Sequence, residues 1–562
     1  MDYKRLAELL FQDVTMTPEE LEEKYPPRNL PEGAKVTRFA PSPTGFVHIG
    51  GVYQTMVGER LAHQSGGVFY LRIEDTDAKR EVPGAAEGLI NTLARYGIRF
   101  DEGAAIGENG EIIDRGDYGP YKQSLRGDIY HVYAKKLVSE GKAYPCFTTE
   151  EELRALEAVD KKAEVKSREW TEETEAEQKA AMRRLREFTI EDVERNLAAG
   201  NRFVLRILAD GDPEKKTPFT DLVKGKLEIP ENDEDFVLLK SDGIPTYHFA
   251  HAVDDHLMRT THVIRGEEWL PSVAKHIQLF RYLGFRLPKY LHTAQIMRLD
   301  ENGNKKKFSK RDLGANMNDY ERDGYAPAAV SEYLLTVLNS NFEEWRMQNP
   351  DKPFTDFKFD IKKMCASGCL FDRAKIEDVS KNVVSRMSAD DVYTQLAGWA
   401  KVYDPDFFAL LDRDPAYAKS ILAIGRGGKK PRKDYGLWSE VKAFVSFFYD
   451  ELFTREDAIP ESFDRADVKA ALGAFADTLD YSDDPNAWFE KIKKIAADLG
   501  YAADMRQYKA DPSAFRGSVA DVSMFIRVAV TGRMNSPDLY TVIHILGADS
   551  TVSRVRGFAE SL

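Results

Sequence analysis

Cysteine is rare in this sequence, with three residues among 562. So few cysteines in a long chain exclude a disulfide framework and are typical of a reducing compartment. An excess of basic charge is also missing, because 93 acidic residues outnumber 79 basic ones and give a net charge of −14. This balance excludes a protein that coats nucleic acid through overall charge, so any contact with nucleic acid must use local basic segments.

Long apolar runs and several common catalytic signatures are also missing. No stretch approaches the ~18 apolar residues of a membrane span, and the start MDYKRLAELLF lacks the basic and apolar parts of a signal peptide. We therefore expect a cytoplasmic protein without a membrane segment. The sequence has no GxxxxGK[ST] phosphate loop, no GxSxG elbow and no HExxH zinc helix. Cys365 and Cys369 lack a second Cys or His pair at structural spacing, so no zinc or other protein-held metal is expected.

Short apolar runs alternate with helical patterns from residue 35 onward. Strands are predicted over 36–39, 68–73, 236–239 and 262–264, and helices over 48–64 and 83–97. Such alternation predicts an α/β fold with a Rossmann-like, doubly wound parallel sheet. Strand signals fade after about residue 320, so the C-terminal half is predicted to be all-helical.

These patterns divide the chain into six segments. They are an N-terminal helical extension over 1–34, a first sheet half over 35–120, an insertion over 121–235, a second sheet half over 236–320, a helical segment over 321–385 and a helical region over 386–562. Capping boxes are expected at Thr17 with Glu20 and at Thr149 with Glu152. The charged stretch 150–200 is predicted to form solvated helices.

A glycine-rich loop, RFAPSPTGFVHIGG over 38–51, joins the first predicted strand to the first helix. Ligands of open parallel sheets bind at the carboxyl ends of strands, which is where this loop lies. Its glycines let the backbone approach a ligand, and the N-terminal end of the next helix favours a phosphate, to which His48 could donate a hydrogen bond. In isolation, such a loop is more often only a tight connection.

A second segment, KKKFSKR over 305–311, gathers cations after the last predicted strand of the sheet. Such a cluster suits the negative charge that develops on the α-phosphate and the leaving pyrophosphate of a nucleotide. A lysine run alone is most often a solvated loop. Together, the two segments imply a nucleotidyl-transfer site assembled from distant parts of one sheet.

The two segments resemble the paired signatures of class I aminoacyl-tRNA synthetases. HIGG over 48–51 is similar to the HIGH signature, and KFSKR over 307–311 to the KMSKS signature. Further stretches resemble bacterial glutamyl-tRNA synthetases: RFAPSPTG over 38–45, LRIEDTD over 71–77, SDGIPTY over 241–247, DDH over 254–256, VIRGEEWL over 263–270, RVAVTG over 527–532 and PDLY over 537–540. The resemblance covers residues 36–562 and leaves the N-terminal extension outside it.

This resemblance implies a glutamate–tRNA ligase that activates L-glutamate with ATP and transfers it to the 3′ end of tRNA(Glu). Glutamate would be bound by Arg38, Ala40, Ser42, Glu74, Tyr247 and Arg265. ATP would lie against His48, Gly50, Gly51, Glu268, Leu270, Lys307, Ser309 and Lys310, of which His48, Lys307 and Lys310 would be catalytic. Arg38, Arg265 and the Tyr247 hydroxyl would hold the side-chain carboxylate, because an arginine fork suits a carboxylate. Glu74 would take the α-ammonium group.

No general base is needed, because a carboxylate is already the nucleophile; positioning and electrostatics would supply the catalysis. Mg²⁺ is expected only as an ion bound with ATP. By resemblance, residues 121–235 would bind the acceptor stem, 321–385 would contact the stem and 386–562 would bind the anticodon. Arg432, within the basic run 426–433, would meet the last anticodon base, although a solvated loop remains the alternative. A monomer is expected.

Four alternatives are less consistent with the sequence. A glutaminyl-tRNA synthetase would carry loops such as RFPPEPNG and RFDDTN and a β-barrel C-terminal half. The short glutamyl-queuosine-type paralogue lacks an anticodon-binding half. A non-catalytic RNA-binding paralogue should have lost His48, Lys310 or the pocket arginines, and a plain nucleotidylyltransferase would not need a long helical tail. The sequence leaves open whether tRNA(Gln) is also charged, what residues 1–34 do, and how His251 affects the pocket.

Overall fold

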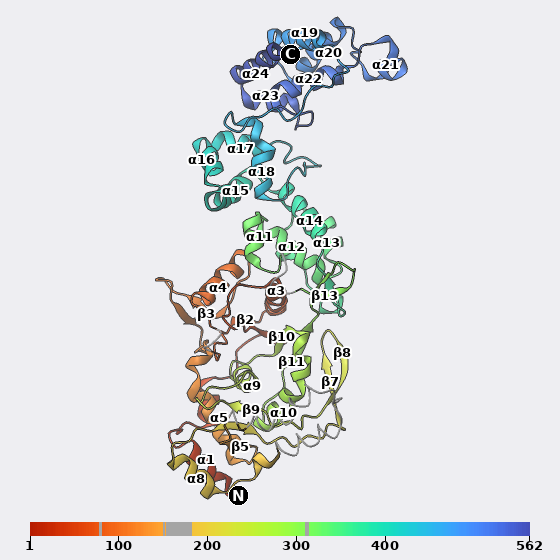
Figure 1. Ribbon diagram of the computed structural model, residues 1–562. Coiled ribbons are helices and arrows are strands. Elements are labelled where there is room, and N and C mark those ends of the chain that lie inside the picture. The colour runs from red at the N-terminus through yellow and green to blue at the C-terminus, as the bar shows by residue number, and fades with distance from the viewer. Residues whose placement is uncertain (78–80, 150–151, 153–182, 309–313) are drawn as a thin grey trace, which may run out of the picture. The chain divides into compact units, whose positions relative to one another are not determined.

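The computed structural model describes residues 1–77, 81–149, 152, 183–308 and 314–562 (Figure 1). The chain divides into two compact units: residues 1–318 with 334–372, and residues 319–333 with 373–562. The first unit combines sheets with helices, whereas the regular elements described in the second are all helices. The predicted α/β fold with a helical C-terminal half is therefore confirmed. The six segment boundaries expected from the sequence stay predictions.

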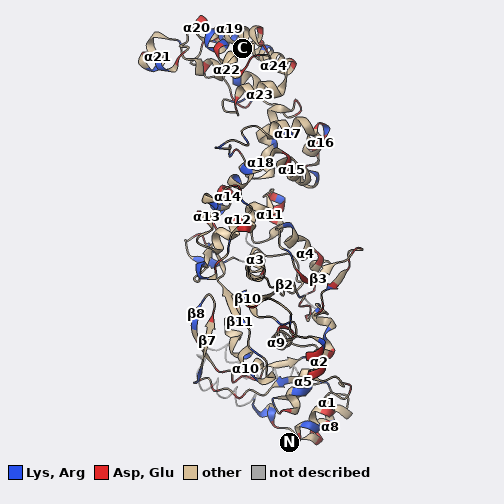
Figure 2. Cartoon of the chain, turned by 180° about the vertical axis from the view of Figure 1, so that it is seen from behind, with Lys and Arg blue, Asp and Glu red and all other residues tan. Residues whose placement is uncertain are grey.

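The N-terminal extension packs against the rest of the first unit. Helix α1 (Tyr3–Leu10) buries Leu6 and Ala7. Helix α2 (Pro18–Lys24) begins with the expected capping box, in which the Glu20 N–H donates to the Thr17 hydroxyl over 3.2 Å. Figure 2 shows α2 largely in red, and its Glu22 carboxylate lies 2.7 Å from the Arg259 guanidinium of the sheet domain. Ion pairing thus ties the extension to the unit.

The first sheet follows the order β1, β2, β3 and β4. Strands β1 (Val36–Phe39), β2 (Val68–Leu71) and β3 (Glu102–Ile106) are parallel, and β4 (Ile112–Arg115) is an antiparallel edge strand. Helix α3 (Ile49–His63) connects β1 to β2 and packs closely on them at Gly58, where a Cβ would lie 3.0 Å from the Phe69 ring. This connection places the start of α3 at the carboxyl end of β1.

The second sheet follows the order β10, β11, β7 and β8. Strands β10 (His262–Gly266) and β11 (Lys289–Thr293) are parallel, whereas β7 (Lys216–Asp221) and β8 (Gly225–Pro230) form an antiparallel hairpin for which the sequence predicts no strand. Strand β10 adjoins β1: the Thr261 N–H donates to the Val36 carbonyl over 2.9 Å, and Arg38 reaches the Ile264 carbonyl over 3.3 Å. Both strands advance in the same direction, so their carboxyl ends lie side by side.

Residues 236–239, which were predicted to continue the parallel sheet, do not belong to it. Strand β9 (Val237–Leu239) instead pairs antiparallel with β6 (Val204–Ile207), which pairs with β5 (Ala143–Cys146). The prediction for this strand is wrong because a short apolar run looks the same in either kind of sheet. A fourth sheet joins β12 (Ile296–Leu299) to β13 (Lys305–Lys307) and β14 (Cys369–Leu370) and carries the start of the second signature.

The helices complete both units. The first unit also contains α4 (Ala85–Arg95), η1 (Gln123–Leu125), α5 (Gly127–Ser139), η2 (Arg184–Arg186), α8 (Ile190–Ala198), α9 (Tyr247–Leu257), η3 (Glu267–Ser272), α10 (Val273–Leu283), α13 (Phe342–Gln348), η4 (Phe354–Asp356) and η5 (Ile361–Lys363), where η denotes a 3₁₀ helix. Helices α11 (Met317–Asp323) and α12 (Pro327–Leu338) contribute to both units. Most of the stretch 150–200 that was predicted to be helical lies outside the described residues.

The second unit is built on one apolar core. Its helices are α14 (Arg373–Arg386), α15 (Ala389–Tyr403), α16 (Pro405–Arg413), α17 (Pro415–Leu422), α18 (Trp438–Val445), η6 (Ser446–Phe448), α19 (Arg465–Thr478), α20 (Pro485–Asp498), α21 (Met505–Ala510), η7 (Pro512–Ala514), α22 (Val519–Thr531), α23 (Leu539–Leu546) and α24 (Ala548–Ser561). Within the described part of the chain, no helix has the length and apolar character needed to cross a membrane.

Candidate active site

A cavity of about 950 Å³ opens in the first unit at the carboxyl ends of β1 and β10. This volume is ample for a small metabolite together with part of a nucleotide. Its lining contains all six residues predicted to bind glutamate, namely Arg38, Ala40, Ser42, Glu74, Tyr247 and Arg265. The fold therefore gathers side chains from four separate sequence segments into one site.

Arg38 lies on the β1 side of this cavity and is paired with a carboxylate. Its Nε lies 3.2 Å from both carboxylate oxygens of Asp255. The same carboxylate accepts a hydrogen bond from Arg72 over 2.8 Å and lies 2.8 Å from Nδ1 of His251. Burial alone would raise the pKa of Asp255, but Arg38 and Arg72 hold it well below its usual value. Arg38 thus already has an ionised carboxylate of the protein as its counter-ion.

This pair is part of a larger ionic cluster. Its members are the arginines Arg38, Arg72 and Arg126 and the carboxylates Glu74, Asp254 and Asp255, all buried. Arg72 donates to Glu74 over 2.9 Å, and Arg126 donates to Asp254 over 2.7 Å. Burial raises the pKa of Glu74 above its usual value although Arg72 opposes this. A cationic substrate group beside Glu74 would favour its ionised form.

His251, whose effect the sequence left open, lies behind Tyr247 and is not among the residues that line the cavity. Its Nδ1 donates to Asp255 over 2.8 Å, and its Nε2 accepts from the Tyr290 hydroxyl over 2.9 Å. The 3.5 Å contact between Nδ1 and Arg38 is therefore not a hydrogen bond, since that nitrogen already carries a proton. Burial lowers the pKa of His251 to about 4, so the ring is neutral and supports Tyr247 by stacking.

Arg265 lies on the β10 side of the cavity and has only neutral partners. Its Nε donates to Nε2 of His292 over 2.9 Å, and its Nη1 lies 3.1 Å from Nδ1 of His276. Longer contacts of 3.4 Å and 3.3 Å reach the Tyr247 hydroxyl and the Trp269 carbonyl. The Tyr247 ring packs on the Trp269 indole with centroids 4.3 Å apart. One wall of the cavity thus combines a cation with two aromatic rings.

The two signature segments meet outside this lining. His48 begins α3, and its Nδ1 accepts a hydrogen bond from the Gly50 N–H over 3.0 Å. The neutral ring must therefore carry its proton on Nε2, which can donate to a phosphate oxygen. The buried Phe308 packs edge-on against His48 at 6.2 Å, and the Ile49 N–H donates to the Ala315 carbonyl over 2.9 Å. A residue of the second signature, Phe308, and a residue just after it, Ala315, therefore contact the first signature.

The described residues among the other predicted ATP contacts belong to β13, α3 and η3. Lys307 ends β13 and is exposed, whereas Ser309 and Lys310 lie outside the described residues. Gly51 belongs to the first turn of α3, and Glu268 and Leu270 belong to η3 directly after β10. The Glu268 carboxylate would collide with any side chain at Gly266, to whose Cβ position it comes within 2.1 Å. The sequence reasoning assigned no role to Trp269, although it lies in the quoted stretch 263–270, and it missed His276 and His292, which lie in no quoted motif.

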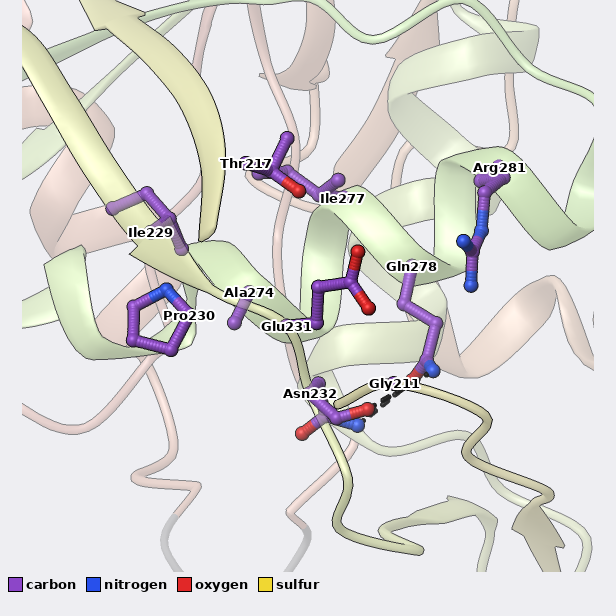
Figure 3. Close-up of a pocket in the computed structure, with 10 residues that line it drawn as sticks. All are labelled: Gly211, Thr217, Ile229, Pro230, Glu231, Asn232, Ala274, Ile277, Gln278 and Arg281. Carbon is purple, nitrogen blue, oxygen red and sulfur yellow. Dashed lines mark hydrogen bonds between the residues drawn. The ribbon is translucent and has the colours of Figure 1, made fainter. Parts of the chain in front are cut away.

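No metal centre stands out in the described residues, and a second cavity, of about 400 Å³, is lined by residues of the N-terminal extension such as Phe11 together with His131 and Phe203. The part of the chain that the structure describes contains no group of three His, Cys, Asp or Glu side chains arranged to hold a metal ion, and the expectation of a zinc-free protein stays a prediction. Figure 3 shows a much smaller hollow between the β7–β8 hairpin and α10, where Asn232 donates to Gln278 over 2.8 Å. Its volume of about 30 Å³ admits little more than one water molecule.

The basic run of the second unit contains two arginines with different surroundings. Arg426 is turned inward and donates to the Leu422 carbonyl over 2.6 Å and to the Tyr435 hydroxyl over 2.7 Å. Arg432, the predicted anticodon contact, is partly exposed and forms a bidentate pair with Asp434 at 2.8 Å and 2.7 Å. Arg426 therefore stabilises the loop, and Arg432 presents a charge held in place by Asp434.

Comparison with known proteins assigns the family. Residues 35–377 match the family described as tRNA synthetases class I (E and Q), catalytic domain, and residues 515–559 match an anticodon binding domain. Glutamate–tRNA ligases of Acetivibrio thermocellus and Sorangium cellulosum are 47% and 46% identical to this chain, covering 99% and 98% of it and 100% of each relative. A crystal structure of a glutamate tRNA ligase from Elizabethkingia meningosepticum, in complex with its amino acid, covers 94% of this chain and 99% of that one, with a TM-score of 0.70 at 27% identity. The chain therefore belongs to the class I tRNA synthetases, among the glutamate–tRNA ligases.

Proposed function

We propose that this chain ligates L-glutamate to tRNA(Glu) in two steps at the cavity between β1 and β10. The observation that carries the proposal is the pairing of opposite charges across one cavity. Arg265 and the Tyr247 hydroxyl face it from one wall, and the Glu74 carboxylate lies on another. This arrangement matches an amino acid that has a cationic α-ammonium group and an anionic side chain.

In the first step, an α-carboxylate oxygen of glutamate attacks the α-phosphorus of ATP, and the bond to pyrophosphate breaks. The Nε2–H of His48 would donate to a phosphate oxygen, and Lys307 and Lys310 would stabilise the charge that develops on the phosphates. Mg²⁺ bound with ATP would neutralise further phosphate charge, and the carboxylates described here form no cage of their own for it. The product is glutamyl-adenylate.

In the second step, a ribose hydroxyl at the 3′ end of the tRNA attacks the activated carbonyl, and AMP leaves. We assign the acceptor stem to residues 121–235, stem contacts to 321–385 and the anticodon to 386–562. Arg432 would face the last anticodon base, where a cationic donor fits the acceptors of cytosine. Whether tRNA(Gln) is also charged depends on that contact. We further propose a cytoplasmic monomer.

Aminoacylation with labelled glutamate tests this function. The purified chain should charge tRNA(Glu) in the presence of ATP and Mg²⁺, and should not charge it with labelled glutamine. Lys310→Ala, the matched control, should lower kcat by roughly 10²–10³, as the loss of one preorganised charge donor does. Pyrophosphate exchange should require tRNA. A wild-type chain that leaves tRNA(Glu) uncharged with glutamate would overturn the proposal.

A further inference from the structure

We propose that His276 and His292 are positioning residues that hold Arg265 in place while leaving its positive charge without a protein counter-ion, so that the side-chain carboxylate of the substrate becomes its counter-ion. The inference rests on the proposed function and deepens it, because it names what makes this wall of the cavity select an anionic side chain. Neither histidine lines the cavity itself.

The fold brings the three side chains together from three elements. Arg265 on β10 and His292 on β11 are register partners of neighbouring parallel strands, and His276 lies on α10, which packs beside them. The two shortest hydrogen bonds of the guanidinium, 2.9 Å and 3.1 Å, go to these histidines. Since the contacts that reach the cavity wall are longer, at 3.3 Å and 3.4 Å, the histidines fix the arginine more firmly than the wall does.

The hydrogen-bond partners of each ring fix the position of its proton. Nδ1 of His292 donates to the buried Asp221 carboxylate over 2.7 Å, which leaves Nε2 as the acceptor for Arg265. A guanidinium only donates, so Nδ1 of His276, 3.1 Å from Arg265, is an acceptor, and the proton of this ring lies on Nε2, which donates to Nδ1 of His248 over 3.0 Å. Burial lowers the pKa of His276 well below its usual value and also lowers that of His292. Both rings are therefore neutral acceptors at physiological pH.

The charge of Arg265 remains uncompensated as a result. Among the described residues, no carboxylate lies within ion-pair distance of its guanidinium, although the side chain is only 4% exposed. Asp221 is separated from it by the His292 ring and already accepts hydrogen bonds from the Val223 and Lys224 N–H groups. A buried cation without a counter-ion is costly in free energy, and an anionic ligand relieves that cost whereas a neutral amide does not.

Histidine is the residue type that this task requires. A carboxylate at either position would hold the guanidinium equally well but would cancel its charge. An aliphatic residue at either position would leave one guanidinium nitrogen without its closest acceptor in a buried place. A neutral imidazole accepts the hydrogen bond and contributes no charge. It can therefore hold Arg265 in place without neutralising it.

Two matched pairs of variants test the inference through the kinetics of tRNA(Glu) charging. His276→Asn keeps an acceptor near the Nδ1 position and His292→Gln keeps one near Nε2, whereas His276→Leu and His292→Leu remove the acceptor at similar volume. Both leucine variants should raise the glutamate KM roughly 10–100-fold, in the range of a lost contact to a buried charge, with the ATP KM unchanged. The acceptor-keeping variants should stay within about threefold of wild type.

Each outcome supports or overturns the inference. A wild-type glutamate KM in the leucine variants would contradict it, and so would equal damage in the leucine and acceptor-keeping variants, which would indicate a packing role only. The two histidines lie on different elements, so either pair decides the question if a variant at the other site fails to fold. A wild-type chain that charges no tRNA with glutamate overturns the proposed function and this inference together, whereas normal wild-type charging with unchanged variants overturns the inference alone.

Discussion

The arginines on the two walls of the cavity have different kinds of partner. Arg38 belongs to an ionic cluster in which three arginines face three carboxylates, all buried. Arg265, equally buried, is held by two neutral histidines, a hydroxyl and a carbonyl. The comparison teaches that Arg38 already has a carboxylate partner within the fold, whereas Arg265 has none among the described residues.

Replacement of Asp255 should have the largest effect on stability, because it leaves the ionic cluster around Arg38 with one carboxylate fewer. Asp255→Asn leaves Arg38 and Arg72 buried with one carboxylate fewer. The first unit should lose about 3–5 kcal/mol of its free energy of unfolding, which is typical when one partner of a buried ion pair is removed. Urea unfolding followed by circular dichroism measures this loss, with His276→Asn as the control from the opposite wall. An unchanged unfolding midpoint would show that the cluster contributes no stability.

Replacement of Arg265 should greatly lower kcat/KM for glutamate and should change the stability of the fold only slightly. Arg265→Leu leaves no buried carboxylate unpaired among the described residues. The removal of a buried charge without a counter-ion offsets the donors that His276 and His292 lose, so the unfolding midpoint should stay near that of wild type. The kcat/KM for glutamate should fall by an amount equivalent to about 2–5 kcal/mol, the range for truncating one partner of a buried charge pair. Steady-state charging and urea unfolding of the same preparation check both halves. A destabilisation as large as that of Asp255→Asn would remove the distinction between the walls.

The buried histidines beside Tyr247 should make stability depend on pH above the range in which carboxylates titrate. Burial lowers the pKa of His248 and His251 to about 4 from an ordinary 6.5. Between pH 6.5 and 4 the unfolded chain therefore binds protons that the folded chain does not, so stability present at neutral pH is lost as the pH falls through this window. The low pKa of Asp255 acts later, below about pH 4, because its ordinary value is 3.8.

A single variant isolates the histidine contribution to this pH dependence. Each such histidine contributes at most about 1.4 kcal/mol per pH unit within the window. His248→Asn, at the outer end of the chain that runs through His276 to Arg265, should flatten the slope of unfolding free energy between pH 6.5 and 4. Urea titrations at half-unit pH steps measure the slope. Identical slopes in wild type and variant would show that His248 titrates normally in the fold.

The smallest effect is expected at Tyr290, which touches both walls. Its hydroxyl donates to His251 over 2.9 Å, while its ring lies under the Arg265 guanidinium at 4.8 Å. Tyr290→Phe removes only the hydroxyl and should cost about 1–2 kcal/mol of stability, since one buried acceptor loses its donor. The glutamate KM should not change. A raised KM would indicate that the two walls are coupled through His251.

The sequence predicts which strands, helix and side chains form this site better than it predicts the partners of the two arginines. Strands β1 and β10 and helix α3 follow from apolar runs and a glycine-rich turn, and resemblance indicated Arg38, Tyr247 and Arg265, which the fold brings to one cavity. The partners of these arginines could not be predicted in the same way. Arg38 meets Asp255 and Arg265 meets His292 only through the order and register of the strands, which no local pattern specifies. The misassigned strand β9 has the same cause.

The most direct test of the account is to give Arg265 a counter-ion. His276→Glu places a carboxylate where a neutral imidazole now lies 3.1 Å from the guanidinium. Competition between labelled glutamate and added glutamine in the charging reaction yields the glutamate KM and the glutamine Ki. We predict that the variant raises the glutamate KM at least about tenfold, equivalent to about 1.4 kcal/mol, while the glutamine Ki stays constant or falls. An unchanged ratio of the two constants, with His276→Asn as the neutral control, would contradict the claim that the uncompensated charge of Arg265 selects the substrate.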